Sequence, residues 1–393
     1  MQQFVDYKKE RIETALTKHR LRALIASLPA NIDYLSGYES IGLQVLNRNR
    51  IFSVYSAEKD AAVLVIPTAE IPTAIERFPD TEMQAFGEFF FAFPSTGGEK
   101  ISEVINNRGK GNLEALIKTL SDLGIESGRV GLDEGRITPQ MWHELTKAFP
   151  GIQWVPAADI FYEIRMIKHK HEITLLEESA KIAEESMYAV LPEIETGTTE
   201  FEIGQRFMEE VAARGAKPYF NVVTVDERSA FSDTINTAKQ VQEGSIIRLD
   251  FGCIYKGYCS DLARTAVFGK CDAKVSDYYQ AILAGEERAV EKIRPGISTE
   301  EIYYTALNET RKAGIPHYNR HHCGHGIGLE IYDWPSVGPG EKSPLEAGMV
   351  LCIETPYYEL GWGGLQVEDT VLVTEEGVRF LSKSSRELVR LGV

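Results

Sequence analysis

The stretch SIIRLDFGCIYKGYCSDLARTAVFG, residues 245–269, predicts two apolar β-strands joined by a tight turn. If the chain turns at Tyr255–Lys256, before Gly257, Asp250 and Asp261 lie directly opposite each other on antiparallel strands. Directly opposed residues point to the same face of a sheet, with Cβ atoms about 4.5–5.5 Å apart. Two carboxylates this close repel each other unless a positive charge lies between them.

A second hairpin with two acids is predicted by MVLCIETPYY (349–358) and LQVEDTVLV (365–373). Glu354 and Glu368 are fourteen residues apart, and a loop centred on Gly361 places them opposite each other. The glycine-rich segment around Gly361 suits such a turn.

Each hairpin follows a pair of predicted helices, at 170–191 and 199–214 before the first and at 274–293 and 298–313 before the second. The second helix of each pair opens with a capping-box pattern. This order repeats after about one hundred residues, and such self-similarity indicates duplicated structural units. We expect the two units to face each other in one curved sheet, with helices outside and a shared site on the pseudo-twofold axis.

Half of the eight histidines lie at 317–325, and RHHCGHGIG (320–328) surrounds His325 with glycines. Histidine is the commonest protein metal ligand, although a histidine-rich loop can also merely pack. Four carboxylates with one imidazole suit two divalent ions such as Mn, Co or Zn, about 3.5–4 Å apart. If the stretch is extended, His321 and His322 point to opposite sides, and we expect no role for His322. The candidate metal ligands are Asp250, Asp261, His325, Glu354 and Glu368.

Other residues beside these ligands are expected to be structural. Asp369 follows Glu368 and should therefore face the opposite side of its strand. Cys259, Cys323 and Cys352 each precede a candidate ligand by two residues. We favour buried packing for these cysteines. The alternative is that Cys259 and Cys352 line the floor of the site and that these thiols make an enzyme sensitive to oxidation.

The region up to about residue 160 predicts a compact α/β domain without a phosphate-binding loop. We interpret FGEFFFAFPSTGG (86–98) as a buried strand followed by a loop, and a flap over a pocket is the alternative. A turn is expected at Pro29–Asn31. Helices are predicted at 1–20, 68–78, 110–124 and 138–148, and strands at 23–29, 51–57, 61–67 and 129–134.

Composition excludes several classes of function. The 393 residues carry 43% apolar side chains, which is enough for two domains with cores of mixed α/β (α+β) class. The net charge of −16, without runs of Lys or Arg, argues against nucleic acid and anionic membranes as partners. No apolar run approaches the roughly 20 residues of a membrane helix, and the N-terminus lacks a signal-peptide core. Five cysteines without C-x-x-C predict reduced thiols and a cytoplasmic location.

The motifs LDFG…YCSDLART, GHGIGL, GMVLCIETPYY and LQVEDTVLV resemble those of the "pita-bread" metallohydrolases, which include prolidase, aminopeptidase P, methionine aminopeptidase and creatinase. The segment NIDYLSGY (31–38) is similar to the creatinase/prolidase N-terminal domain. The resemblance covers nearly the whole chain. It implies an N-terminal domain at 1–160 and a pita-bread catalytic domain at 161–393.

The resemblance also implies roles for the candidate ligands. Asp250 would bind one metal, Asp261 and Glu368 would bridge, and His325 with Glu354 would bind the second metal. A bridging water would be the nucleophile, and Glu354 would carry a proton to the leaving nitrogen. Members with two such domains are usually homodimers, with the partner's N-terminal domain near the active-site mouth. Phe89–Phe93 is a candidate for an apolar edge at that mouth.

The chain departs from the prolidase pattern at positions that shape the substrate site. The helper histidine four residues before the ligand histidine is kept as His321, but two further helper histidines are replaced by Asp233 and Tyr332. The arginine expected two residues before Glu368 is Gln366. Asp233 would favour an amine-bearing substrate or form a local ion pair.

Three hypotheses follow for the function. We favour a dinuclear-metal hydrolase of a C–N bond, similar to Xaa-Pro dipeptidases and aminopeptidases and acting on a dipeptide or small amide. The alternative is a creatinase-like or other non-peptidase hydrolase or lyase. A catalytically inactive binding protein is disfavoured because all five ligand positions are kept.

Overall fold

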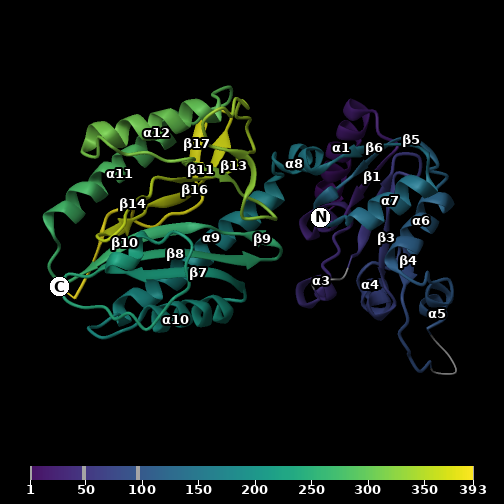
Figure 1. Cartoon of the computed structure of the whole chain (residues 1–393), viewed down its shortest axis with the longest axis horizontal. Coiled ribbons are helices and arrows are strands. Elements are labelled where there is room, and N and C mark those ends of the chain that lie inside the picture. The colour runs from purple at the N-terminus through teal and green to yellow at the C-terminus, as the bar shows by residue number, and fades with distance from the viewer. Residues whose placement is uncertain (1, 47–49, 94–97, 393) are drawn as a thin grey trace. The chain divides into compact units, whose positions relative to one another are not determined.

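The computed structural model describes residues 2–46, 50–93 and 98–392 and divides into two compact units, Met1–Arg165 and Met166–Val393 (Figure 1). The boundary expected at residue 160 falls inside helix α8 (Ala158–Arg165). Among the described residues, no helix is both long enough and apolar enough to cross a membrane.

The first unit is a six-stranded sheet in the order β4-β3-β2-β1-β5-β6. Its centre, β1, is buried along its whole length because it pairs on both sides, antiparallel with β2 and parallel with β5. The strands are β1 (Ala23–Ala26), β2 (Phe52–Ser56), β3 (Ala61–Pro67), β4 (Glu82–Phe86), β5 (Ser127–Leu132) and β6 (Gly151–Pro156). The helices, besides α8, are α1 (Gln2–His19), α2 (Pro29–Ser36), α3 (Ile41–Val45), α4 (Ile71–Arg77), α5 (Glu99–Asn106), α6 (Asn112–Asp122) and α7 (Pro139–Ala148).

Two expectations for this unit are wrong. Pro29 opens helix α2 rather than a turn, since proline is tolerated in the first turn of a helix, where its missing N–H costs nothing. The stretch after β4 is not a buried strand, because β4 ends at Phe86 and two of the following phenylalanines are exposed, Phe89 by 49% and Phe90 by 87%. The part of that prediction at 94–97 lies outside the described residues. Strands β4 and β6 and several short helices had not been predicted.

The second unit is built on one large sheet whose main path is β12-β11-β13-β16-β10-β8-β7. The two repeats meet where β10 pairs antiparallel with β16, and Ala263 is the partner of Glu368. The strands on this path are β7 (Lys217–Val225), β8 (Ile246–Tyr255), β10 (Leu262–Phe268), β11 (Gly324–Gly326), β12 (Asp333–Ser336), β13 (Val350–Glu354) and β16 (Glu368–Thr374). Shorter strands are β9 (Tyr258–Cys259), β14 (Tyr357–Glu359), β15 (Gly363–Leu365), β17 (Gly377–Phe380) and β18 (Val389–Leu391).

Two pairs of helices cover this sheet, one pair from each repeat, as the sequence predicts (Figure 1). Each pair encloses its own apolar core with its own hairpin. The capping boxes form at Thr199 with Glu202 and at Ser298 with Glu301. The helices are α9 (Lys170–Val190), α10 (Glu200–Ala213), α11 (Ala273–Lys292) and α12 (Thr299–Ala313).

The register of the first hairpin differs from the prediction by two residues. Tyr255 pairs with Tyr258, so the loop is Lys256–Gly257, and Asp250 lies opposite Ala263 rather than Asp261. Both loop residues have positive φ, 48° and 89°, as the tightest hairpin turns require. A shift by two residues keeps the side chains on the same face. The second hairpin has the predicted register, with Glu354 directly opposite Glu368.

Candidate metal centre

The five candidate ligands come from five chain segments and converge at the junction of the two repeats. Asp250 lies within β8, Asp261 precedes β10, and His325 is the middle residue of β11. The His325 Nε2 atom is 3.5 Å from Asp261 Oδ2 and 3.9 Å from Glu368 Oε1. Glu354 ends β13 opposite Glu368, and both carboxylates lie against the same pocket as the two aspartates.

The donor atoms fit a divalent metal centre. The Nδ1 atom of His325 lies 3.0 Å from the Gly326 carbonyl, and this contact leaves Nε2 facing the acids, as metal-binding histidines require. Oε1 of Glu368 is buried and has no hydrogen-bond partner among the described residues. One donor atom each from Asp261, His325, Cys352 and Glu368 lies within 4.8 Å of the others. Such a site therefore offers mostly hard oxygen donors with one imidazole beside a thiol.

The electrostatics of the cluster favour a cation. Burial, together with the charge of Asp261, raises the pKa of Asp250 to about 7. Burial and the neighbouring acids also raise the pKa of Glu368 well above its ordinary value. Burial acts on Glu354 in the same direction, but His322 and Arg320 outweigh it and lower the pKa of this carboxyl. Burial raises the pKa of Asp261 as well, so the charged forms of Asp250, Asp261 and Glu368 are destabilised until a positive charge lies among them.

A pocket of about 510 Å³ opens above these ligands. Asp233, His321, Tyr332 and Gln366, which the sequence assigns to the substrate side, all contribute to its wall. Asp233 is exposed and forms no ion pair with any residue that the structure describes. The Tyr332 ring stacks on the His325 ring, with centroids 3.9 Å apart, so it covers one side of that ligand.

The expectation that His322 points to the side opposite His321 is wrong. Its Nε2 lies 2.7 Å from Glu354 Oε1, and its ring lines the pocket beside that of His321. The chain bends at His321 and Cys323 and becomes a strand only at Gly324. The alternation of an extended strand therefore does not apply to the two adjacent histidines.

The Gln366 side chain is held between two charged groups. Its carbonyl oxygen accepts a 2.8 Å hydrogen bond from Arg248, and its amide nitrogen donates to Glu368 Oε2 at 3.2 Å. Gln366 is 2% exposed although it lies at the pocket wall. It therefore orients the Glu368 carboxylate.

Two arginines near the ligands were not predicted from the sequence. Arg248 is fully buried and lies 3.2 Å from Asp250. The sequence did indicate a role for Arg248, because a charged residue is unusual in an apolar strand. Arg248 also stands two residues before the candidate ligand Asp250 and therefore on the same face of the strand. Arg320 lies in the pocket wall, 3.9 Å from Glu354, and directly precedes the two histidines.

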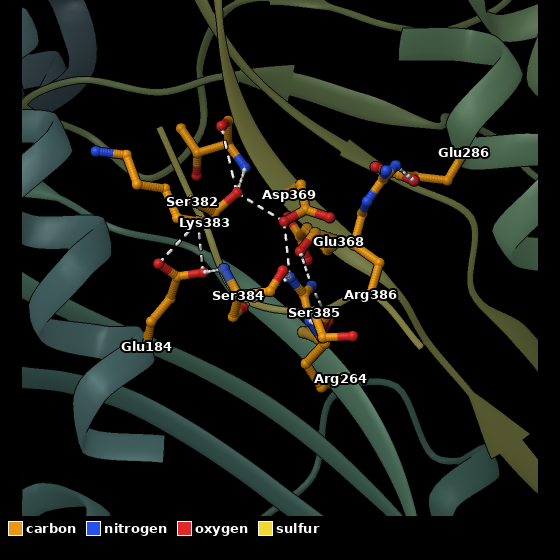
Figure 2. Close-up of polar contacts among 12 residues, drawn as sticks. Glu184, Arg264, Glu286, Glu368, Asp369, Ser382, Lys383, Ser384, Ser385 and Arg386 are labelled. Atoms are coloured by element: carbon orange, nitrogen blue, oxygen red, sulfur yellow. Dashed lines mark hydrogen bonds and ion pairs between the residues drawn. The ribbon is translucent and has the colours of Figure 1, made fainter. Parts of the chain in front are cut away.

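Asp369 faces away from the metal centre, as predicted. Its carboxylate forms a buried ion pair with Arg264 at 2.8 Å and accepts a hydrogen bond from Ser382 (Figure 2). Arg264 also donates to the main-chain carbonyl of Glu368 at 2.7 Å. The face of β16 that points away from Glu368 is thus anchored by a network of charged and polar groups.

The three cysteines next to the candidate ligands are buried, as expected, but the Cys352 thiol also lies among the candidate donor atoms, as the alternative expected. Cys259 and Cys352 belong to one apolar cluster and Cys323 to another. None of them lines the pocket. Burial raises the pKa of Cys323 to about 12 and that of Cys352 well above its ordinary value. These thiols are therefore protonated near neutral pH unless a metal binds them.

This fold and site define a two-domain, metal-dependent peptide hydrolase. Residues 174–375 match metallopeptidase family M24, and residues 8–167 match the creatinase/prolidase N-terminal domain. The chain belongs to family M24.

Relatives of known name or structure match the chain along nearly its whole length. An Xaa-Pro dipeptidase of Pyrococcus furiosus is 28% identical over 388 residues, which cover 97% of this chain and 100% of the relative. The solved structure of an Xaa-Pro dipeptidase from Bacillus anthracis superposes with a TM-score of 0.82 at 25% identity, covering 98% and 99% of the two chains. The prolidase from Pyrococcus horikoshii gives 0.80 at 26% identity, covering 97% and 99%.

Proposed function

We propose that this chain is a dinuclear-metal hydrolase that cleaves the C–N bond of a dipeptide, in the manner of an Xaa-Pro dipeptidase or aminopeptidase. The observation that carries this proposal is the convergence of four carboxylates and His325 beneath one pocket. Two relatives that match nearly the whole chain are named Xaa-Pro dipeptidases, and these names support a dipeptide as the substrate.

In this proposal the metal ions would be held by Asp250, Asp261, His325, Glu354 and Glu368. Two bound divalent cations, for which we propose manganese, with cobalt or zinc as alternatives, would make water nucleophilic at neutral pH. Gln366 and Arg248 hold the carboxylates of Glu368 and Asp250 in place.

Proton transfer is assigned to Glu354. Contact with His322 and proximity to Arg320 favour its ionised form, so it can accept a proton and pass it to the leaving nitrogen. His321 lies in the pocket wall and serves as the helper on the substrate side. Asp233 is exposed in the same pocket and would bind an amino group of the substrate, beside Tyr332 and Gln366.

A ligand variant tests the proposal directly. Asp261→Ala should lose both bound metal, measured by elemental analysis, and hydrolysis of Xaa-Pro dipeptides with Mn, Co or Zn supplied separately. Asp277→Ala on the exposed face of α11 is the matched control and should lose neither. Unchanged activity and metal content in Asp261→Ala would reject the proposal.

The second candidate is a creatinase-like or other non-peptidase reaction on a small molecule. Asp233, Tyr332 and Gln366 favour it, because they stand where prolidase-type enzymes carry two histidines and an arginine. A screen that pairs several Xaa-Pro dipeptides with small amides separates the two candidates. Rapid cleavage of several dipeptides excludes the second, whereas cleavage of small amides alone excludes the first.

We also propose that the protein is a cytoplasmic homodimer. Five cysteines without a disulfide support a reducing compartment, and the exposed side chains of Phe89, Phe90 and Phe93 support a contact with a partner. Sedimentation of the wild type beside a Phe89→Ser/Phe90→Ser variant tests the contact. A variant as dimeric as the wild type would exclude these residues from it.

A further inference from the structure

Arg320 carries a charge in the pocket wall that the protein itself leaves without a hydrogen bond. Its guanidinium donates no hydrogen bond to any residue in the described parts of the chain, and its Nε is buried without a partner. The nearest carboxylate oxygen, Oε2 of Glu354, is 3.9 Å from Nη2, which is too long for a hydrogen bond. The side chain is 13% exposed, and it lines the pocket.

The other arginine of the site, Arg248, shows the contrast. Its guanidinium donates to Asp250, to Gln366 and to the main-chain carbonyls of Ser229, Phe231 and Ser232. These contacts use up its donors, so it has no capacity left for a ligand. Of these two arginines, only Arg320 therefore offers donors to a bound molecule.

Among the described residues, Arg320 is also held in place without a hydrogen bond at its donor atoms. Its guanidinium lies over the ring of Tyr358, 5.4 Å from the ring centroid, and its main-chain carbonyl accepts a hydrogen bond from Tyr303. A planar guanidinium with free donors matches a carboxylate through two parallel hydrogen bonds. Because stacking already restricts the side chain, little conformational freedom is lost when a ligand binds.

We propose that Arg320 is the anion anchor of this pocket and binds the carboxylate of the substrate. Asp233, exposed in the same pocket, supplies the opposite charge. The substrate is then a small zwitterion that carries both an amino group and a carboxylate, with the scissile bond between them. The identity of the cleaved bond rests on the proposed function. The binding of a carboxylate by Arg320 does not depend on it.

Binding measurements test the anchor without relying on catalysis. Isothermal titration of metal-loaded protein with L-proline and with L-prolinamide compares two ligands that differ in the carboxylate. Arg320→Met should weaken proline binding by about 10- to 100-fold, the worth of a charged hydrogen bond, and leave prolinamide binding unchanged. Arg320→Lys keeps the charge but not the planar guanidinium, so its affinity for proline should lie between those of the wild type and Arg320→Met. Arg288→Met, on the exposed face of α11, is the control and should bind proline as tightly as the wild type.

Equal proline affinity in the wild type and in Arg320→Met would overturn the anchor, because another group would then hold the carboxylate. If Arg320→Met fails to fold, the proposal depends on Arg320→Lys, and full proline affinity in that variant would overturn it.

A kinetic comparison separates the anchor from an effect on Glu354. For Gly-Pro, kcat/KM should fall about 10- to 100-fold in Arg320→Met, whereas for Gly-Pro amide it should change less than threefold. An equal fall for both substrates would show that Arg320 acts only through Glu354 and would overturn the anchor. A wild type that binds proline through Arg320 but cleaves no dipeptide would reject the proposed reaction and leave the anchor standing.

Discussion

Glu354 and Glu368 stand directly opposite each other on neighbouring strands, yet their surroundings shift their pKa values in opposite directions. Of the two glutamates, only Glu354 has His322 within 2.7 Å and Arg320 within 3.9 Å, whereas Glu368 has the acids Asp261 and Glu354 as its main charged neighbours. The same chemical group is therefore ionised more readily at position 354 than at position 368.

The contact between His322 and Glu354 leads to a prediction at this scale. His322→Asn should lower metal affinity or activity by roughly 10- to 100-fold, because groups that orient a metal ligand typically have this effect. Metal titration and dipeptide hydrolysis measure it. His317→Asn is the control from the same segment, since His317 bonds Tyr357 rather than a ligand. Wild-type metal affinity and activity in His322→Asn would show that the contact is not used.

At the scale of elements, β16 presents Glu368 to the candidate metal centre and Asp369 to the opposite side. Behind it, Arg264 joins the strand to the segment 382–386 through Asp369 and the main chain of Glu368 (Figure 2). Glu184 on α9 accepts the N–H groups of Lys383 and Ser384 and fixes that segment. The position of the last ligand thus depends on chain that follows it by more than ten residues.

Removal of one partner from this network should be costly. Arg264→Met should lower the free energy of unfolding by about 3–5 kcal/mol, because it leaves the Asp369 carboxylate buried without its arginine. The double variant Arg264→Met/Asp369→Leu should recover much of that loss. Urea unfolding of the single and double variants measures both values, and strictly additive losses would contradict a coupled pair.

The Lys256–Gly257 turn gives a second prediction at this scale. Gly257→Ala should destabilise the protein by about 1–2 kcal/mol, because φ at this residue is +89°. Lys256→Asn should instead be neutral or stabilising, since asparagine tolerates positive φ before glycine in such turns. Thermal unfolding compares the two, and equal effects would contradict the assigned turn.

At the scale of the whole catalytic unit, each repeat encloses its own core, and the acids meet where the repeats join. Without metal, the folded pKa of Asp250 is about 7 and that of Glu368 lies well above its ordinary value, while both are near 4 in the unfolded chain. The folded state then binds more protons between pH 4 and pH 7, so these groups make stability fall as pH rises. With metal bound, stability should instead rise with pH, because protons compete with the metal for these carboxylates.

This linkage predicts a stability change on metal removal. At pH 7.5 without metal, Glu368→Gln should have a Tm higher than the wild type by roughly 2–4 °C, the shift that about 1 kcal/mol causes in a domain of this size. The difference should shrink toward pH 5, where the wild-type carboxyl is protonated. With Mn²⁺ the order should reverse, because the variant lacks a ligand. Scanning calorimetry at both pH values measures this, and a metal-free wild type more stable than Glu368→Gln at pH 7.5 would contradict it.

Much of the catalytic unit could be predicted because its signals are local. Helix periods and capping boxes located α9 to α12, and the spacing of Glu354 and Glu368 about Gly361 defined their register. The turn of the first hairpin was misplaced because Lys256 must adopt positive φ, which its side chain does not signal. The exposed phenylalanines after β4 were misjudged because local hydrophobicity does not report what lies next to a segment.

The sequence by itself determined the two-unit α/β architecture, the duplicated repeat and the five candidate ligands, because these follow from periodicity and from the rule that alternate residues share a strand face. Only the tertiary structure decided which charges face Glu354 and which face Glu368. Arg320, His322 and Arg248 reach the site through a bend and a strand pairing that bring distant segments together. Electrostatic effects depend on such distances between atoms, and spacing along the chain does not contain them.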